Sequence, residues 1–213
     1  AQEKAASAAT RTEQFVKEIG DQVAWTTLLP QAGAGADPLE PRRFDFVRLG
    51  KLVQPITEAN YIDAKGCLQV KESRLEIWGA GECLADLSKE VRFLGARASG
   101  VYYGPVYFRK ETEPYMAIAL KAAGGGVSAV EVNLKFIWEV IQRIRIGEAG
   151  LAYVVNKDGN LIAHPDISLV LQKTDFSTLP QVKMALQVNP AGPGDSHERV
   201  LLGEARARNG RTV

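Results

Sequence analysis

Residues 150–165 read Gly-Leu-Ala-Tyr-Val-Val-Asn-Lys-Asp-Gly-Asn-Leu-Ile-Ala-His-Pro, and this stretch decides the fold that the sequence predicts. A β-branched and aromatic run leads into a polar turn that ends at Gly159, and a second apolar run follows. This pattern is typical of a β-hairpin, because a tight turn between two strands needs a residue that tolerates a positive φ. Residues 60–70, Asn-Tyr-Ile-Asp-Ala-Lys-Gly-Cys-Leu-Gln-Val, repeat the pattern around Gly66.

The two hairpins align at an offset of 159 − 66 = 93 residues, which also places Asp63 on Asn156 and Leu68 on Leu161. A hairpin repeated at the spacing of a small domain predicts two similar modules in tandem. The chain of 213 residues is long enough for one large domain or two small ones. Two small modules also argue against a single catalytic cleft.

The remaining sequence predicts an α+β protein. Phe15, Ile19 and Val23 recur every fourth position, so residues 1–29 should form a long amphipathic helix. Three prolines and two glycines in residues 30–42 indicate a loop. The other expected elements are a helix over residues 44–57, a loop with one helical turn over residues 84–98, an antiparallel meander of strands 101–109, 115–120 and 127–132, a helix from Leu134 to Gly147, and a last strand over residues 200–208.

Composition excludes several classes of protein. The hydrophobic content of 46% and the charged content of 24% are ordinary for a folded soluble domain. A net charge of +1 provides no strong field for nucleic acid or an anionic membrane, so we expect no nucleic-acid partner. No apolar stretch approaches the roughly 20 residues that span a bilayer. The chain begins without Met and without a signal-peptide pattern, which favours a piece of a longer protein.

Groups suited to catalysis or metal binding are few. The only histidines are His164 and His197, and no zinc-ligand, nucleophile-elbow or P-loop pattern is present, so we expect no metal, cofactor or catalytic residue. A hydrolase that uses His164 or His197 is the enzyme alternative, and a purely structural or protein-binding domain is another. Spacing alone does not show whether Cys67 and Cys83 form a disulfide, and two separate thiols are the favoured interpretation.

An aromatic and basic cluster is the candidate ligand site. Strand alternation over residues 101–109 places Tyr103, Tyr107 and Arg109 on one face, with Tyr102 and Phe108 on the other. Tyrosine supplies an apolar wall and a hydroxyl, and arginine matches a carboxylate, so a small organic acid or an amino-acid-like molecule could bind. An ordinary aromatic sheet face is the alternative. The candidate ligand-binding residues are Arg92, Tyr102, Tyr103, Tyr107, Arg109 and Tyr115.

The order of these elements resembles a double Cache sensor domain, the extracytoplasmic part of bacterial transmembrane receptors. Residues 101–109 with 113–119, and residues 130–138, carry the resemblance, and residues 150–165 carry it most specifically. The resemblance implies a long N-terminal helix followed by two tandem PAS-like modules with antiparallel sheets. The implied division is a helix and loop over residues 1–43, a membrane-distal module with its linking helix over residues 44–147, and a membrane-proximal module over residues 148–213 that is incomplete at its C-terminal end.

The resemblance also implies a function. The chain would be the periplasmic, extracytoplasmic part of an inner-membrane protein, anchored by flanking segments, and it would not itself be an enzyme. A two-component histidine kinase is the first expectation for the whole protein, and a chemoreceptor or a nucleotide or diguanylate cyclase also fits. The ligand would bind in the distal module under residues 73–100, where this chain has Arg92-Phe-Leu-Gly and many amino-acid-binding members have Arg followed closely by Trp-Tyr. The N-terminal helix would be a homodimer interface.

Overall fold

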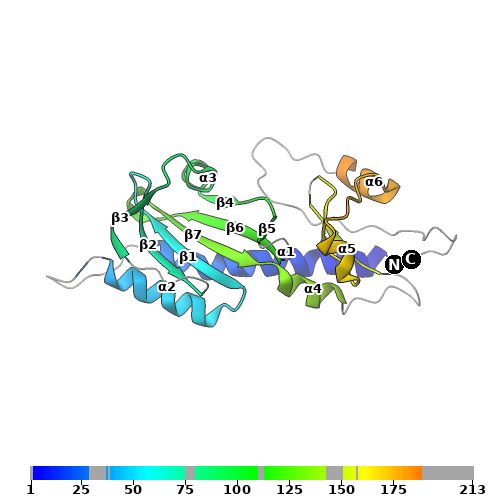
Figure 1. Ribbon diagram of the computed structural model, residues 1–213, viewed down its shortest axis with the longest axis horizontal. Helices are drawn as coiled ribbons and strands as arrows, with labels where there is room; N and C mark the ends of the chain where they lie inside the picture. The colour runs from blue at the N-terminus through cyan, green and yellow to red at the C-terminus, as the bar shows by residue number, and fades with distance from the viewer. Residues whose placement is uncertain are drawn as a thin grey trace. The chain divides into compact units, whose positions relative to one another are not determined.

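The structure, a computed structural model, describes residues 2–28, 37, 39–74, 80–109, 113–142, 151–156 and 158–188 (Figure 1). Contacts divide the chain into two compact units. The sheet unit comprises Glu18–Gly104 and Tyr115–Asn133, and the hairpin unit comprises Ala1–Lys17, Pro105–Pro114 and Leu134–Val213. The mixture of helices with antiparallel sheets confirms the predicted α+β class.

A single antiparallel sheet forms the centre of the sheet unit. Its strand order is β3-β2-β1-β7-β6-β4, and β5 also pairs with β6. The helices and strands from the N-terminus to the end of this sheet are α1 (Gln2–Ala24), η1 (Trp25–Thr27), α2 (Glu40–Leu52), β1 (Ile56–Ile62), β2 (Cys67–Ser73), β3 (Ala80–Asp86), α3 (Val91–Ser99), β4 (Val101–Tyr103), β5 (Tyr107–Arg109), β6 (Glu113–Lys121), η2 (Ala123–Gly125) and β7 (Val127–Asn133).

Helices cover both faces of this sheet, with α3 on one side and α2 on the other (Figure 1). Phe93 and Ala96 of α3 pack against Ile62, Ala119 and other buried residues of the sheet. On the α2 side, the Arg42 guanidinium lies 3.7 Å from the centre of the Tyr61 ring and donates to the carbonyl oxygen of Thr26 at 2.8 Å. Alternate residues of β1 therefore point toward different helices, as strand geometry requires.

The hairpin unit is smaller in its described part. It contains α4 (Lys135–Gln142), β8 (Val154–Val155), β9 (Leu161–Ala163), α5 (Ile167–Leu171) and α6 (Pro180–Val188). Strands β8 and β9 form an antiparallel pair. Trp138 of α4 donates its indole N–H to the carbonyl oxygen of Ile162 at 2.8 Å, which fixes that helix on the hairpin.

Both predicted hairpins are present, and they use the same turn. Oδ1 of Asp63 accepts the backbone N–H groups of Lys65 and Cys67, and Oδ1 of Asn156 accepts those of Asp158 and Asn160. Gly66 has φ 91° and Gly159 has φ 84°, so both positions need the conformational freedom of glycine. The equivalence that the offset predicted is confirmed at the level of individual hydrogen bonds.

The repeat extends further than the sequence pattern indicated. The carbonyl oxygen of Gly66 accepts the N–H of Leu87 at 2.7 Å, and that of Gly159 accepts the N–H of Phe176 at 2.9 Å. In each case an Asp one residue earlier and a Ser one residue later form a second turn: Asp86 Oδ1 accepts Ser88 N–H, and Asp175 Oδ1 accepts Ser177 N–H. Helices α3 and α6 follow these turns. The two units therefore share one local plan.

Two helix predictions are corrected. Helix α2 begins at Glu40, inside the stretch predicted as a loop, because Pro41 lies in the first turn, where its missing N–H costs no hydrogen bond. Residues 84–98 contain the end of β3 and most of α3, where a loop with one helical turn was predicted. Helix α3 contains Gly95, a poor helix former, and it is stabilised by burial of Phe93 and Ala96.

The predicted strand over residues 101–109 is also corrected. It is two short strands, β4 and β5, separated at residues 104–106. Gly104 still donates its N–H to Ala117 at 2.8 Å, but Pro105 has no N–H to continue the ladder. The predicted order of the meander holds, since β4 and β5 pair with β6 and β6 pairs with β7. The strand predicted over residues 200–208, and most of the loop at 30–42, lie outside the described residues.

Candidate functional site

A cluster of buried charges lies on the α3-facing side of the sheet. Glu58 of β1 and Glu131 of β7 are directly opposite each other in the antiparallel register, and their side chains are 8% and 10% exposed. Two like charges at such a position repel, so each needs a compensating cation. Lys71 Nζ lies 3.3 Å from Glu58 Oε2, and Arg92 Nη1 lies 3.0 Å from Glu131 Oε1.

Asn60 lies next to these carboxylates and is 1% exposed. Its Nδ2 donates to Glu58 Oε1 at 2.9 Å, whereas its Oδ1 is buried with no hydrogen-bond partner. A buried acceptor without a donor costs about 1–3 kcal/mol. The charge cluster, which we define as Glu58, Asn60, Lys71, Arg92 and Glu131, therefore offers an acceptor site to a ligand N–H or O–H group.

The structure places Arg92 in this cluster, as one member of a set that sequence reasoning only partly found. Its Nε lies 2.6 Å from Glu90 Oε2 in addition to the contact with Glu131. Each of the carboxylates of Glu58, Glu90 and Glu131 therefore has a cation within 3.3 Å. Sequence reasoning missed Glu58, Asn60, Lys71 and Glu131. Their signal was polar residues at alternate positions of otherwise apolar strands, as in Glu58 and Asn60 of Ile56–Ile62.

Two of the predicted tyrosines share the face of the cluster. Tyr115 is opposite Asn133 in the β6–β7 register, two positions from the pair of Ala117 and Glu131. Its hydroxyl accepts Asn133 Nδ2 at 3.1 Å, and its side chain is almost fully buried. Tyr102 packs beneath α3 so closely that a Cβ built at Gly95 would lie 2.6 Å from its ring.

The other three predicted residues lie elsewhere. Tyr103 points to the opposite side of β4 from Tyr102, toward α1, where its hydroxyl oxygen would lie 3.2 Å from a Cβ built at Gly20. Burial, with a smaller contribution from Asp21, raises the pKa of Tyr103. Tyr107 and Arg109 are on β5, in the hairpin unit. The six predicted residues therefore do not form one group, because the chain breaks between β4 and β5.

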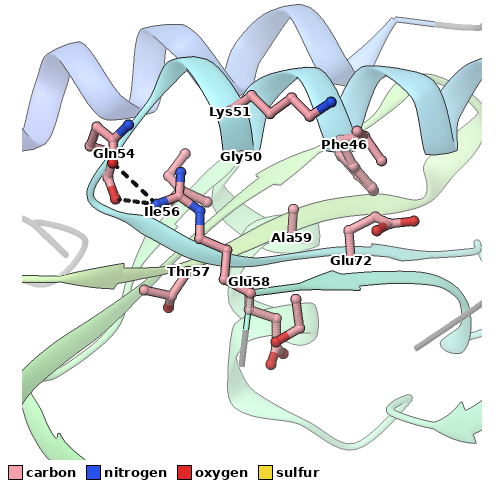
Figure 2. A pocket seen from close by; sticks show the side chains of 12 residues that line it. Phe46, Gly50, Lys51, Gln54, Ile56, Thr57, Glu58, Ala59 and Glu72 are labelled. Atoms are coloured by element: carbon pink, nitrogen blue, oxygen red, sulfur yellow. Dashed lines mark hydrogen bonds between the residues drawn. The ribbon is translucent and has the colours of Figure 1, made fainter. Parts of the chain in front are cut away.

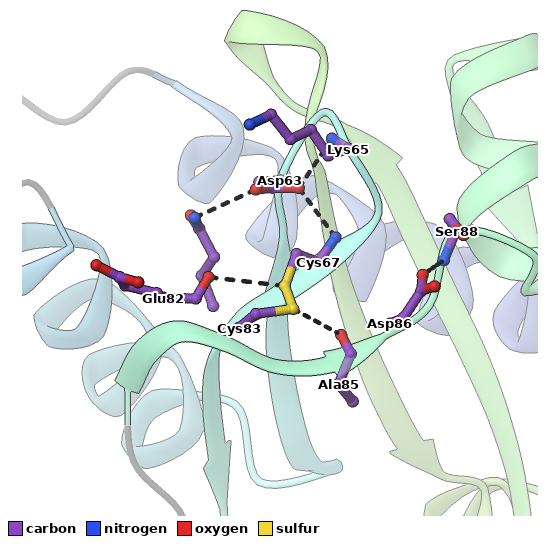
Figure 3. The surroundings of a disulfide bond; sticks show 9 residues. Asp63, Lys65, Cys67, Glu82, Cys83, Ala85, Asp86 and Ser88 are labelled. Carbon is purple, nitrogen blue, oxygen red and sulfur yellow. Dashed lines mark hydrogen bonds between the residues drawn. A yellow bond between two sulfur atoms is a disulfide. The ribbon is translucent and has the colours of Figure 1, made fainter.

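Cys67 and Cys83 form a disulfide between β2 and β3 (Figure 3). The favoured interpretation of two separate thiols is wrong. These strands are antiparallel neighbours, and their pairing brings the two Cα atoms to 5.4 Å, within the range a disulfide requires. The bond ties β3, at the end of the strand order, to the sheet that carries the charge cluster.

His164 has the environment of a structural residue. It is 8% exposed, and its ring centre lies 6.3 Å from those of Tyr153 and Phe176. Its Nδ1 accepts the backbone N–H of Asp166 at 2.9 Å, and burial lowers its pKa. The Nδ1 atom of His164 is therefore engaged by the backbone of Asp166. The second histidine of the hydrolase alternative, His197, lies outside the described residues.

Two kinds of feature are absent from the described part of the chain. No group of three or more His, Cys, Asp or Glu side chains there is arranged to hold a metal ion. Among the described helices, none combines the length and the apolar character needed to cross a membrane.

No protein-family model matches the sequence, and no curated protein matches it either. Solved structures do match the arrangement described above. The fold is that of extracellular sensor domains. The ligand-binding domain of the Pseudomonas aeruginosa amino-acid chemoreceptor PctC, in complex with GABA, matches with a TM-score of 0.60 and 16% identity, over 99% of this chain and 87% of that one.

Two further structures extend this likeness. The extracellular domain of a proposed histidine kinase, mmHK1S-Z2, has a TM-score of 0.67 at 12% identity and covers 99% of this chain and 94% of its own. The sensory domain of the Campylobacter jejuni chemoreceptor Tlp3 has a TM-score of 0.60 at 11% identity and covers 98% of this chain and 80% of its own. At these identities the likeness is one of fold, and the fold is the one that the resemblance to double Cache domains implied.

Proposed function

We propose that this chain is the extracytoplasmic ligand-sensing domain of a bacterial transmembrane receptor. Its ligand is a small molecule that binds the sheet unit on the α3-facing side, at the charge cluster. The shared fold supports the sensor assignment, since the matching structures are described as extracellular, sensory or ligand-binding domains. The chain itself has no catalytic role in this proposal.

One observation carries the choice of site. Asn60 Oδ1 is a buried acceptor without a donor, and it lies beside two opposed carboxylates. Removing the five polar side chains of the charge cluster from water is costly. A protein gains little stability from burying polar groups that are not fully paired. A ligand ammonium group would donate to Asn60 Oδ1 and be attracted to the neighbouring carboxylates of Glu58 and Glu131. A ligand carboxylate would be attracted to Arg92.

This chemistry favours an amino-acid-like ligand over a plain organic acid. A plain carboxylate offers no donor to Asn60 Oδ1, whereas a zwitterion brings that donor together with a carboxylate for Arg92. The PctC domain was solved with GABA, a molecule of this kind, which is consistent with the proposal but concerns that protein.

The test is calorimetric titration, preceded by a melting-temperature screen, with the common amino acids, γ-aminobutyrate and matched small organic acids. We expect one group of amine-bearing acids to raise the melting temperature. Asn60→Leu and Glu131→Gln should each weaken that binding by about tenfold or more, because each removes a partner of the ammonium group. Lys121→Gln, at the exposed end of β6, is the matched control and should bind like the wild type.

The proposal fails if no compound in the screen shifts melting, or if Asn60→Leu and Glu131→Gln bind as tightly as Lys121→Gln. A second outcome would correct only the ligand class: plain organic acids that bind more tightly than their amino counterparts.

The place of this domain in the whole receptor is part of the same proposal. We assign the sheet unit to the membrane-distal module, expected over residues 44–147, and the hairpin unit to the membrane-proximal module, expected over residues 148–213. The bounds differ, since residues 105–114 and 134–147 belong to the hairpin unit. Flanking segments would anchor the protein in the inner membrane, with the domain in the periplasm. A histidine kinase remains the first candidate for the output module of the whole receptor. The likeness to two chemoreceptor domains gives a chemoreceptor comparable support.

Signalling would require that the ligand bind two domain or dimer arrangements with different affinity. The N-terminal helix is the proposed homodimer interface and transmission element. Light scattering of the purified domain with and without ligand tests this step: a monomer under both conditions, at concentrations well above the ligand Kd, would remove the dimer from the proposal.

A further inference from the structure

A groove of about 400 Å³ lies under α2, in the sheet unit (Figure 2). Its wall is the C-terminal half of α2, and its floor is formed by β1 and β2. Glu58 belongs to β1, but its side chain points away from α2 in Figure 2. The groove therefore opens on the other face of the sheet from the charge cluster. Its volume is in the range of pockets that hold small ligands.

Gly50 keeps this groove open. It lies within α2, where glycine costs about 1 kcal/mol relative to alanine. A Cβ built at Gly50 meets no atom within 4 Å, so no neighbour requires a glycine here. Gly50 also lines the groove. The absence of a side chain at Gly50 therefore leaves free space in the groove.

Part of the lining of the groove is apolar. Phe46 of the wall and Ile56 and Ala59 of the floor are each at most 2% exposed. An apolar body that binds here would contact close-packed hydrocarbon and aromatic surface. The same residues are held in place by the core of the sheet unit, so the floor is preformed.

Charges of opposite sign flank this floor on the same strand. Glu72 and Arg74 are two residues apart on or beside the end of β2, so they point to one face with Cα atoms about 7 Å apart. Arg74 Nη1 donates to the backbone oxygen of Gln54 at 3.1 Å, which holds the guanidinium against the end of α2. Lys51, on α2, adds a second cation to the lining.

Glu72 supplies the negative charge at the side of the groove. It is half-buried, and no hydrogen bond or ion pair engages its carboxylate within the described part of the chain. Burial raises its pKa, and the opposing effect of Arg43 is smaller. The carboxylate is thus incompletely compensated where it stands, at the side of an open groove.

We propose that the groove under α2 is a second small-molecule site, and that it takes a zwitterion whose ammonium and carboxylate groups are separated by an apolar spacer. The ammonium group meets Glu72, the carboxylate meets Arg74 and Lys51, and the spacer lies over Phe46, Ile56 and Ala59. This site is separate from the charge cluster and does not rest on the function proposed for it.

The probe is 6-aminohexanoate, with hexanoate and hexylamine as controls that each lack one charge. Ligand-observed NMR titrations of the wild-type domain should give saturable binding of 6-aminohexanoate, and each control should bind about tenfold more weakly or less. Gly50→Trp fills the groove and should abolish binding, whereas Gly50→Ala strengthens the helix and leaves most of the space, so it should still bind. Glu72→Gln should weaken binding by about tenfold.

Asn60→Leu separates the two sites. It removes the acceptor of the charge cluster and should leave 6-aminohexanoate binding unchanged, so failure at either site can be recognised alone. Circular dichroism checks that Gly50→Trp is folded, and Gly50→Met replaces it if it is not. Three results would overturn the proposal: no saturable binding to the wild type, binding that persists in the folded groove-filling variant, or equal affinity for 6-aminohexanoate and both controls.

Discussion

Among the glycines of the sheet unit that the structure describes, Gly66 should be the least replaceable. Its φ of 91° is strained for any residue with a Cβ, at a cost of roughly 1–2 kcal/mol. A Cβ at this position would also lie 2.4 Å from Cα of Ser88 and 2.8 Å from its backbone nitrogen. These are backbone atoms of the turn that follows β3, so the turn itself must move, at a cost of about 1–3 kcal/mol. We therefore expect Gly66→Ala to lower the free energy of unfolding by about 2–5 kcal/mol.

Gly100 supplies the matched control. Its φ is 85°, but a Cβ there meets nothing within 4 Å. Gly100→Ala therefore carries the backbone strain without the collision, and the difference between the two variants isolates the contact with Ser88. Urea titrations followed by circular dichroism give both values. Hydrogen exchange monitored by mass spectrometry should show that Gly66→Ala loosens residues 86–99 as well as the hairpin.

Equal destabilisation by Gly66→Ala and Gly100→Ala would refute this reasoning, because the close approach of the second turn would then have no energetic consequence. The repeat provides an independent trial. A Cβ at Gly159 would lie 2.6 Å from Cα of Ser177, so Gly159→Ala should loosen residues 175–188 in the same way.

Other parts of the chain give further predictions. Replacing Cys67 and Cys83 together by Ser opens a loop with a sequence separation of 16, and urea titration should show a loss of about 3 kcal/mol that reductant reproduces in the wild type. Arg92→Met takes the close cation from the buried Glu131 carboxylate and should cost about 3 kcal/mol in the same assay, with part of the loss recovered when Glu131→Met is added. Burial holds the pKa of His164 below 6.5, so its stabilising effect is complete above that pH and is lost as pH falls through the lower, folded-state pKa. The melting temperature should therefore fall between about pH 7.5 and about pH 5.5, and His164→Gln should reduce that fall.

Local chemistry explains which predictions from sequence succeeded. The hairpins are encoded by a few adjacent residues, since Asp63 or Asn156 fixes the turn by accepting two N–H groups and Gly66 or Gly159 supplies the positive φ. Such turns can be recognised in isolation. The long N-terminal helix was likewise predictable from its period, and α1 with η1 covers residues 2–27 of the predicted 1–29.

Features that depend on partners distant in sequence were not predictable. Helix α3 contains Gly95 and is held by burial of Phe93 and Ala96, which no local signal reveals. The disulfide required the knowledge that β3 pairs with β2. The charge cluster required the register of β1 against β7, which alone places Glu58 opposite Glu131 over a separation of 131 − 58 = 73 residues.

The duplication gives an internal comparison that bears on the cluster. At the offset of 93 residues, Glu58 corresponds to Leu151 and Asn60 to Tyr153, so the second copy has an aliphatic and an aromatic side chain where the first has buried polar groups. Both copies nevertheless form the same hairpin turn, and in both copies a second turn donates an N–H group to the glycine of that hairpin. The shared plan therefore does not need charges at these positions, and burying them is costly. Glu58 and Asn60 are therefore buried polar groups that the scaffold can do without, and Asn60 Oδ1 lacks a donor. These properties fit the ligand recognition that we propose better than they fit maintenance of the fold.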